Sequence, residues 1–292
     1  MKALSALKYT AALCLAAAMS GLSVSPKTLF SYEFPKDYTE EQNFSDGFSV
    51  KDGFHTCISG GKLSSISSFG VPVHIISPDF DAVSADYFVF SLQCGYFEPN
   101  SILKVTFTMT DGSTQTSEIK LSDRNTNVYA VKLPETEEKI IKFEIFPDIQ
   151  ADMMEMYNVD LDYARFENAK KLVFLKIGDN KLFADSEYKE TDAPAVIDSG
   201  RTLTPARYVA EALGAQVEWD EQTKRVTVKK DDIVINLFIG KDHAFVNGKE
   251  VELDCPAKII GNRTYTPARF VAENLGYSVS WDDNSKTVIV TD

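Results

Sequence analysis

An internal repeat at an offset of 62 residues constrains this chain more than any other feature. Residues 201–228 read RTLTPARYVAEALGAQVEWDEQTKRVTV, and residues 263–290 read RTYTPARFVAENLGYSVSWDDNSKTVIV. Seventeen of these 28 positions are identical without a gap. Self-similarity at one fixed offset indicates two copies of a single supersecondary unit. We place the copies at residues 172–230 and 231–292.

Each copy predicts a β-rich segment, a short helix and a closing pair of strands. Asn247-Gly248 is typical of a two-residue hairpin turn. The helices are expected to begin after the N-cap residues Thr204 and Thr266 and to run to Leu213 and Leu275. Their apolar faces are expected to pack on the sheets. The prolines fit a first helical turn and the glycines a left-handed helix end; these are Pro205, Pro267, Gly214 and Gly276.

The other repeated residues receive structural roles. Trp219 and Trp281 are the only tryptophans, and we interpret them as core anchors beneath the helices rather than as sugar-stacking platforms. An arginine lies one turn before a glutamate on each helix, which predicts surface ion pairs; the pairs are Arg207–Glu211 and Arg269–Glu273. Arg201 and Arg263 stand where a loop enters the helix and are expected to hold that loop in place.

The repeated motif resembles the copper amine oxidase N-terminal domain, also called the stalk domain. It occurs twice with its Pro, Arg, Glu, Leu-Gly and Trp-Asp in register, and we call residues 172–292 the stalk region. The resemblance implies a non-catalytic add-on of secreted and cell-wall proteins that lies apart from the copper centre. The chain has no Asn-Tyr dipeptide, and its three histidines are scattered singly. We therefore expect no copper or quinone cofactor.

Residues 28–168 differ in texture from the repeats. Short alternating stretches such as LKVTFTMT are separated by turn clusters, and Asp111-Gly112 predicts a hairpin. The fold class we predict is mainly β with small α+β modules: an antiparallel β-sandwich followed by the tandem hairpin/helix repeats. The order of these segments also resembles that of galactose-binding-like jelly rolls, which implies a carbohydrate-binding-like module.

That second resemblance implies candidate site residues. Residues 28–168 contain no tryptophan, so a sugar would have to stack on tyrosine or phenylalanine. The candidates are Tyr87, Tyr96, Phe97 and Tyr129. We expect most of these side chains to be buried in the core instead. Asp160 and Asp162 share one face of the last strand, which permits a structural calcium site or a solvated strand face. Cys57 and Cys94 are either bridged or buried thiols.

Residues 1–25 are typical of a signal peptide: Lys2 and Lys8 supply positive charge, and a short apolar stretch and then small residues follow. Cleavage there changes the net charge from −13 to −15. The acidity argues against a nucleic-acid partner. The sequence predicts no transmembrane segment after signal removal.

These features predict an exported, non-catalytic protein of the cell surface or cell wall. The stalk region serves as scaffold or interaction unit, and the partners expected are wall glycan or envelope proteins. G-x-S-x-G, H-E-x-x-H and G-K-[ST] motifs are all lacking. The alternatives are an unrecognised glycan-active enzyme built on the sandwich and a protein–protein assembly factor of the envelope. The sequence is compatible with two independent repeats and with two repeats that share one core.

Overall fold

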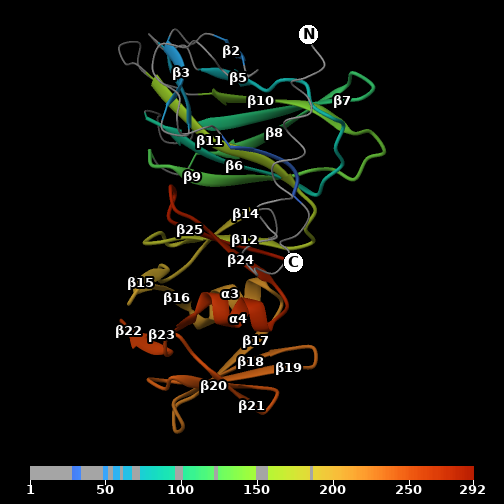
Figure 1. The fold of residues 1–292 in the computed structure, drawn as a ribbon. Coiled ribbons are helices and arrows are strands. Elements are labelled where there is room, and N and C mark those ends of the chain that lie inside the picture. Colours follow the sequence, from blue (N-terminus) through green and yellow to red (C-terminus); the bar gives the residue numbers. More distant parts are fainter. Residues whose placement is uncertain are drawn as a thin grey trace.

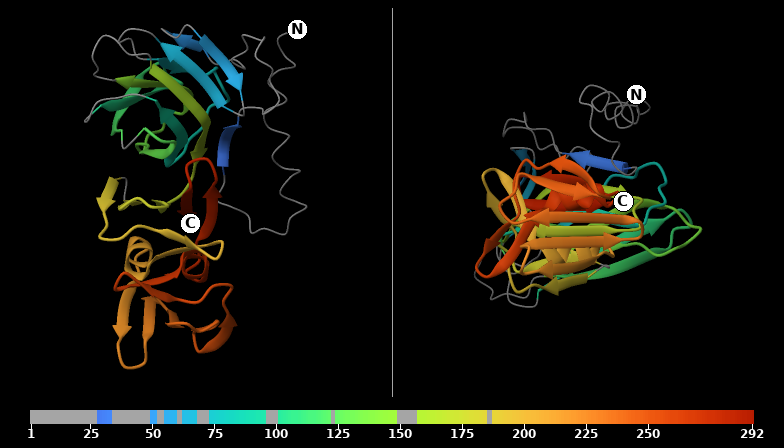
Figure 2. Two further views of the ribbon diagram at one scale, coloured as in Figure 1. Left: turned by 90° about the vertical axis from the view of Figure 1, so that its left-hand side faces the viewer. Right: turned by 90° about the horizontal axis from the view of Figure 1, so that it is seen from below.

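The computed structural model describes residues 28–33, 49–51, 55–59, 62–67, 73–95, 101–121, 124–148, 157–184 and 187–292. A β-sandwich lies above the stalk region along one long axis (Figures 1 and 2). The fold is mainly β with two described helices, both in the stalk region, which confirms the predicted fold class.

The sandwich consists of two antiparallel sheets. Sandwich sheet 1 has the order β3 (His55–Ser59), β4 (Lys62–Ser67), β11 (Tyr157–Glu167), β6 (Tyr87–Cys94) and β9 (Asn127–Lys132), with β1 (Thr28–Glu33) paired to β11. Sandwich sheet 2 has the order β2 (Ser49–Lys51), β5 (His74–Ile76), β10 (Ile140–Asp148), β7 (Ile102–Met109) and β8 (Thr114–Lys120).

Alternation along the strands explains the core between these sheets. In β7 every second residue is buried, as the sequence pattern predicted. Aromatic rings fill the centre, and the Phe88 ring lies 4.6 Å from that of Phe143 and 4.9 Å from that of Phe166. The predicted hairpin at Asp111-Gly112 joins β7 to β8, with Gly112 at a φ of 83°.

The topology also separates Cys57 from Cys94. Cys57 lies on β3 and Cys94 on β6, and β4 and β11 stand between those strands. Three inter-strand spacings amount to about 14 Å, whereas bridged cysteines have Cα atoms within about 7 Å. A Cys57–Cys94 disulfide is therefore excluded, and Cys94 is buried in the core.

The stalk region contains three sheets and two helices. The upper stalk sheet has the order β14 (Glu187–Glu190), β13 (Lys181–Ala184), β12 (Leu172–Lys176), β25 (Thr287–Thr291) and β24 (Ser278–Asp282). The lower stalk sheet has the order β17 (Gln216–Asp220), β18 (Arg225–Lys230), β19 (Ile233–Phe238), β20 (His243–Val246) and β21 (Lys249–Glu252). The middle stalk sheet has the order β15 (Val196–Asp198), β16 (Arg201–Pro205), β23 (Arg263–Pro267) and β22 (Lys258–Ile260).

The two repeats exchange strands, so neither has a core of its own. The last hairpin of the second repeat, β24–β25, pairs with β12 of the first, and β17–β18 of the first pairs with β19 of the second. Strand β16 pairs with β23 between the repeats. One hydrophobic core runs from Val173 to Val290 through both repeats. The repeats are thus related by a pseudo-twofold arrangement with one shared core.

Helices α3 (Ala206–Ala212) and α4 (Ala268–Asn274) contact each other between the upper and lower stalk sheets (Figure 1). The expected helix ends are confirmed: Leu213 is the C-cap of α3, and Gly214 follows at a φ of 82°. The expected threonine N-caps are wrong. Pro205 and Pro267 hold the N-cap positions, because Thr204 and Thr266 are buried partners in the β16–β23 pairing.

The upper stalk sheet packs on the outer face of sandwich sheet 1. Tyr87, Val89 and Val128 of the sandwich meet Phe174 and Phe183 of the stalk region in a second apolar cluster. The Lys176 Nζ atom donates to Asn127 Oδ1 at 2.6 Å, and the Tyr188 hydroxyl donates to the Val128 carbonyl at 2.8 Å. Both sides of β6 are therefore covered, which matches its nearly unbroken burial.

Candidate functional site

A groove of about 380 Å³ opens between α3, the edge strand β17 and the turn of the β22–β23 hairpin. It lies in the stalk region and takes residues from both repeats. We call it the Trp219 groove. Its lining residues are Asp192, Pro205, Ala206, Arg207, Tyr208, Val217, Glu218, Trp219, Val226, Asn262, Arg263 and Thr264.

Trp219 is the exposed aromatic side chain of this groove, with 39% of its surface accessible. Its indole Nε1–H donates to Glu221 Oε2 at 2.9 Å, and Lys224 pairs with the other oxygen of the same carboxylate. These contacts hold the pKa of Glu221 below its ordinary value, first through the hydrogen bond from Lys224 and then through that from Trp219. The ring is thus held in place at its edge.

A polar network spans the groove from one repeat to the other. The Tyr208 hydroxyl donates to Asp192 Oδ1 and accepts the Asp192 backbone N–H at 2.8 Å, while Arg263 Nη2 donates to Asp192 Oδ2. The Tyr208 hydrogen bond is the largest of the effects that lower the pKa of Asp192, and Arg263 adds to it. Partial burial and the Asp192 contact raise the pKa of Tyr208. Asp192 therefore remains a carboxylate and Tyr208 a neutral phenol near neutral pH.

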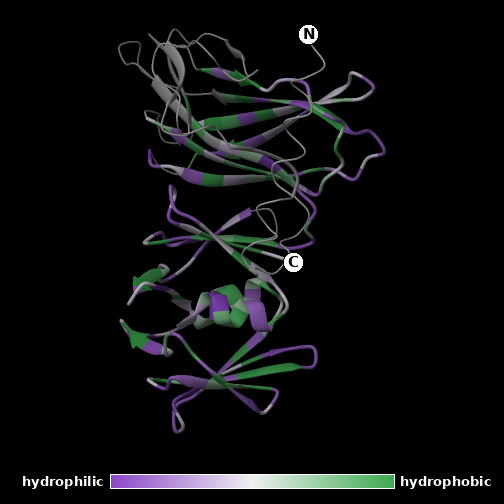
Figure 3. Ribbon diagram, viewed as in Figure 1, coloured by the Kyte–Doolittle hydropathy of each residue, from purple (hydrophilic) through white to green (hydrophobic). Residues whose placement is uncertain are grey.

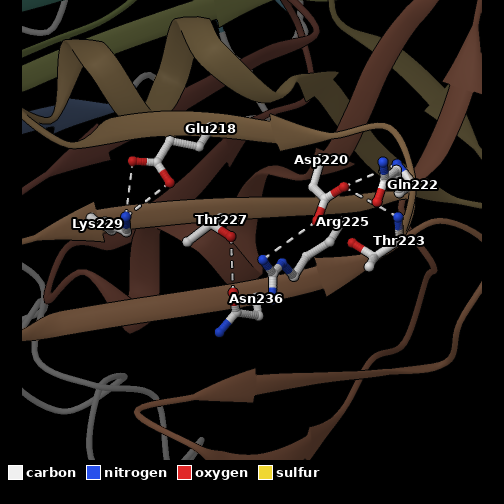
Figure 4. A network of polar contacts seen from close by, with 8 residues as sticks. All are labelled: Glu218, Asp220, Gln222, Thr223, Arg225, Thr227, Lys229 and Asn236. Atoms are coloured by element: carbon white, nitrogen blue, oxygen red, sulfur yellow. Dashed lines mark hydrogen bonds and ion pairs between the residues drawn. The ribbon is translucent and has the colours of Figure 1, made fainter.

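The strand that carries Trp219 is braced on its polar side (Figure 4). Lys229 donates to both oxygens of Glu218 at 2.8 and 2.9 Å across the β17–β18 pair. Asp220 Oδ1 accepts the backbone N–H groups of Gln222 and Thr223, which closes the turn that bears Glu221. The contacts with Thr223 are the main cause of the lowered pKa of Asp220.

The interpretation of the two tryptophans as core anchors is wrong. Trp219 and Trp281 are 39% and 37% exposed. Val217, two residues before Trp219, packs against the shared core. Trp219 instead lines the groove together with Ala206 and Arg207 of α3, so the helix borders the indole without enclosing it.

The other repeated residues have the structural roles expected. Both helices carry the expected exposed ion pair. The Arg207 Nε atom lies 3.4 Å from Glu211 Oε1, and the Arg269 Nη1 atom lies 3.5 Å from Glu273 Oε1. Arg201 and Arg263 do hold loops, but each holds the loop of the other repeat. Arg263 pairs with Asp192, and in the mirrored contact Arg201 pairs with Asp254.

Two of the predicted sugar-stacking residues of the sandwich lie in apolar interiors. Tyr129 is 1% exposed in the sandwich core and Tyr87 is 4% exposed beneath the upper stalk sheet, so neither presents a ring face to a ligand. Tyr96 and Phe97 lie outside the described residues. Asp160 and Asp162 lie on β11, but their side chains are outside the described part, and the calcium site stays a prediction.

Sequence reasoning missed the roles of two groove residues, Asp192 and Tyr208, and of two residues that hold the Trp219 ring, Glu221 and Lys224. A signal was present for the last two. Each tryptophan is followed by an acid two residues later and by a lysine five residues later, as WDEQTK and WDDNSK. An acid and a lysine repeated at fixed distance from an aromatic residue indicate a clamp on that residue.

Two features are absent from the described residues. No group of three or more His, Cys, Asp or Glu side chains in that part of the chain is arranged to hold a metal ion. No described helix is long and apolar enough to cross a membrane.

The comparison with protein families assigns the part of the chain that carries the groove. Residues 182–290 match the copper amine oxidase N-terminal domain. This match covers both repeats as one unit and confirms the predicted resemblance. A protease inhibitor of Brevibacillus choshinensis is 34% identical over 97 residues, which cover 32% of this chain and 30% of that protein. The chain thus spans about a third of the curated relative that it matches.

Solved structures resemble the chain at low scores. A mutant of a family 29 carbohydrate binding module is 9% identical, covering 47% of this chain and 91% of its own, with a TM-score of 0.33. The N-terminal cellulose-binding domain of Cellulomonas fimi β-1,4-glucanase C is 9% identical over 44% of this chain and 92% of its own, with a TM-score of 0.31. The agarase AgWH50C, also 9% identical, reaches 0.33 over 48% of this chain and 24% of its own. Matches at this level carry no argument about ligand or activity.

Proposed function

We propose that this protein is an exported, non-catalytic binding protein that holds a carbohydrate chain in the Trp219 groove. The observation that carries the proposal is the exposed indole of Trp219, fixed at its edge by Glu221 beside charged and hydroxyl groups. The copper amine oxidase N-terminal domain then acts both as scaffold and as binding unit. The glycan-binding site is thus proposed in this domain, whereas the sequence predicted it in the sandwich.

The groove suits a sugar chemically. A pyranose ring offers an apolar C–H face that packs on an aromatic ring, while its hydroxyls need hydrogen-bond partners around the edge. Asp192 and Arg207 place a carboxylate and a guanidinium group in the groove that Trp219 lines. Because the Trp219 N–H is already bonded to Glu221, its ring loses little freedom on binding.

The same groups argue for binding rather than catalysis. A glycosidase needs one carboxylic acid with a raised pKa to protonate the leaving group. The pKa of Asp192 is shifted in the opposite direction, and that of Tyr208 is raised above its ordinary value of 10.0. Neither group exchanges a proton readily near neutral pH. We propose that binding proceeds without copper or another cofactor.

Export and location at the cell envelope are part of the proposal. They are supported by the signal-peptide pattern of residues 1–25, which lie outside the described part of the chain. An acidic protein is suited to a neutral or cationic wall component more than to an anionic one.

A pull-down on insoluble, uncharged cell-wall polysaccharide tests the proposal. The wild-type protein is expected to sediment with the polysaccharide without releasing reducing sugar. Trp219→Ala is expected to lose at least about tenfold in affinity, since a central tryptophan commonly contributes about 2 kcal/mol or more to an interface. Ile259→Ala removes an exposed apolar side chain outside the groove and serves as the matched control. Equal binding by both variants, or release of reducing sugar, contradicts the proposal.

Protein binding is a second candidate, favoured by the middle stalk sheet. Its edge strands β15 and β22 expose Ile197, Ile259 and Ile260, and Figure 3 shows much, though not all, of both strands in the hydrophobic colour. Each of these strands ends in a tight turn with consecutive positive φ angles, at Ser199-Gly200 and Gly261-Asn262. The named activity of the Brevibacillus choshinensis relative is protease inhibition. Inhibition of subtilisin or trypsin by the wild type, lost in Ile259→Ala, is the expected result if this candidate is correct.

A further inference from the structure

Trp281 is held in the same way as Trp219, in the other repeat. It lies on β24, the edge strand of the upper stalk sheet, and is 37% exposed. Its indole N–H donates to Asp283 Oδ1 at 3.2 Å, and Lys286 Nζ donates to the same oxygen at 2.8 Å. The hydrogen bond from Lys286, followed by that from Trp281, lowers the pKa of Asp283. A large exposed aromatic side chain fixed by the same clamp thus occurs in both copies.

The surroundings of Trp281 follow from the pseudo-twofold relation. Edge strand β17 contacts α3, and edge strand β24 contacts α4 in the equivalent way. The Asp192–Arg263 pair of the Trp219 groove has its counterpart in the Asp254–Arg201 pair. In the first pair the aspartate comes from the first repeat, and in the second pair it comes from the second repeat. The same kinds of element and the same cross-repeat ion pair therefore occur at both positions.

One substitution makes the second position less polar than the first. Phe270 stands where the first repeat has Tyr208, so Asp254 has no phenol at the equivalent place. A ligand at the second position thus finds one hydroxyl fewer.

We propose that Trp281 is the platform of a second carbohydrate site, equivalent to the Trp219 groove across the pseudo-twofold axis. The proposal rests on the proposed function, because both sites are assigned the same ligand class. The second site binds more weakly, by roughly fivefold, since a neutral hydrogen bond commonly contributes about that factor. Because Trp219 belongs to the lower stalk sheet and Trp281 to the upper one, one molecule bridges two glycan segments.

Tryptophan fluorescence separates the two sites, because the chain has no other tryptophan. The full-length variant Trp281→Phe reports on Trp219 alone, and Trp219→Phe reports on Trp281 alone. Each is titrated with wall polysaccharide solubilised by sonication, after a thermal melt has shown that the fold is retained. Light scattering of the same polysaccharide mixed with wild-type protein measures bridging. Ile259→Ala is again the control.

The expected result is a saturable emission change in both variants, with half-saturation about fivefold higher for Trp281. Scattering is expected to rise with the wild type but with neither Trp219→Ala nor Trp281→Ala, because alanine removes the aromatic face that phenylalanine keeps. A response from Trp219 alone overturns the second site and leaves the proposed function intact. No response from either residue overturns both. A response from Trp281 alone retains the second site and removes the assignment of the Trp219 groove.

Discussion

Substitution of Val290 by alanine tests the shared core of the stalk region. Val290 lies on β25, is fully buried, and pairs with Val173 of the first repeat and Val279 of the second. The change removes two carbon atoms from the interior. At about 0.8 kcal/mol per buried methylene plus a cavity term, the expected loss is about 2 kcal/mol. For a unit of this size we expect the melting temperature to fall by about 8 °C.

The informative measurement is made at a distance from the substitution. Val290→Ala is combined with Trp281→Phe, so that the fluorescence melt reports only on Trp219 in the lower stalk sheet. Because one core joins the two sheets, the Trp219 melt is expected to shift by the whole amount, about 8 °C. Val228 occupies the equivalent buried position on β18. The mirrored experiment combines Val228→Ala with Trp219→Phe and reads Trp281.

The two melts also define the result that refutes this reasoning. If Val290→Ala leaves the Trp219 transition unchanged while calorimetry records a separate transition that has moved, the repeats unfold independently. The strand exchange would then not couple them energetically. If Val290→Ala shifts the Trp219 melt and Val228→Ala shifts the Trp281 melt, the stalk region unfolds as a single cooperative unit.

Three further predictions follow from the same contacts. A chain ended after Lys230 is expected to lack a cooperative stalk transition in calorimetry, because β12, β16 and β18 lose their partners β25, β23 and β19; a cooperative melt with native circular dichroism would contradict this. The pKa of Asp192 is lowered from 3.8, so the stability that its carboxylate contributes is present above about pH 4 and is lost as the pH falls through the folded-state pKa. In Asp192→Asn the melting temperature should therefore fall less steeply with decreasing pH than in the wild type. An unchanged slope would count against the Asp192–Tyr208–Arg263 network. Burial raises the pKa of the Cys255 thiol, so iodoacetamide is expected to modify Cys255 only in denaturant, and rapid labelling of the native chain, located by peptide mass spectrometry, would disprove its burial.

Local features of the stalk region were predictable from the sequence. The Asn247-Gly248 turn has both residues at positive φ, as its dipeptide predicts, and Gly214 ends α3 in the left-handed conformation. These features depend on a few neighbouring residues and on backbone sterics. The 62-residue offset likewise indicated the element order of each copy, because the same sequence folds in the same way twice.

Features that depend on strand exchange were not predictable. Nothing local to Arg263 shows that its partner is Asp192, which lies 71 residues earlier in the chain. The exposure of Trp219 depends on the groove that α3 and the β22–β23 turn of the other repeat leave beside it, which alternation along the strand does not reveal. The burial of Tyr87 required knowledge that the upper stalk sheet covers β6, although the apolar start of that strand, residues 87–90, is typical of burial on both faces.

The accessibility of Trp219 to a small quencher tests the central claim most directly. In the Trp281→Phe protein, acrylamide quenching is measured with and without saturating solubilised wall polysaccharide. We predict that the polysaccharide lowers the quenching constant severalfold, because a bound sugar ring covers the exposed indole face. An unchanged constant, at a polysaccharide concentration where the protein is shown by sedimentation to be bound, would contradict the assignment of the Trp219 groove as the binding site.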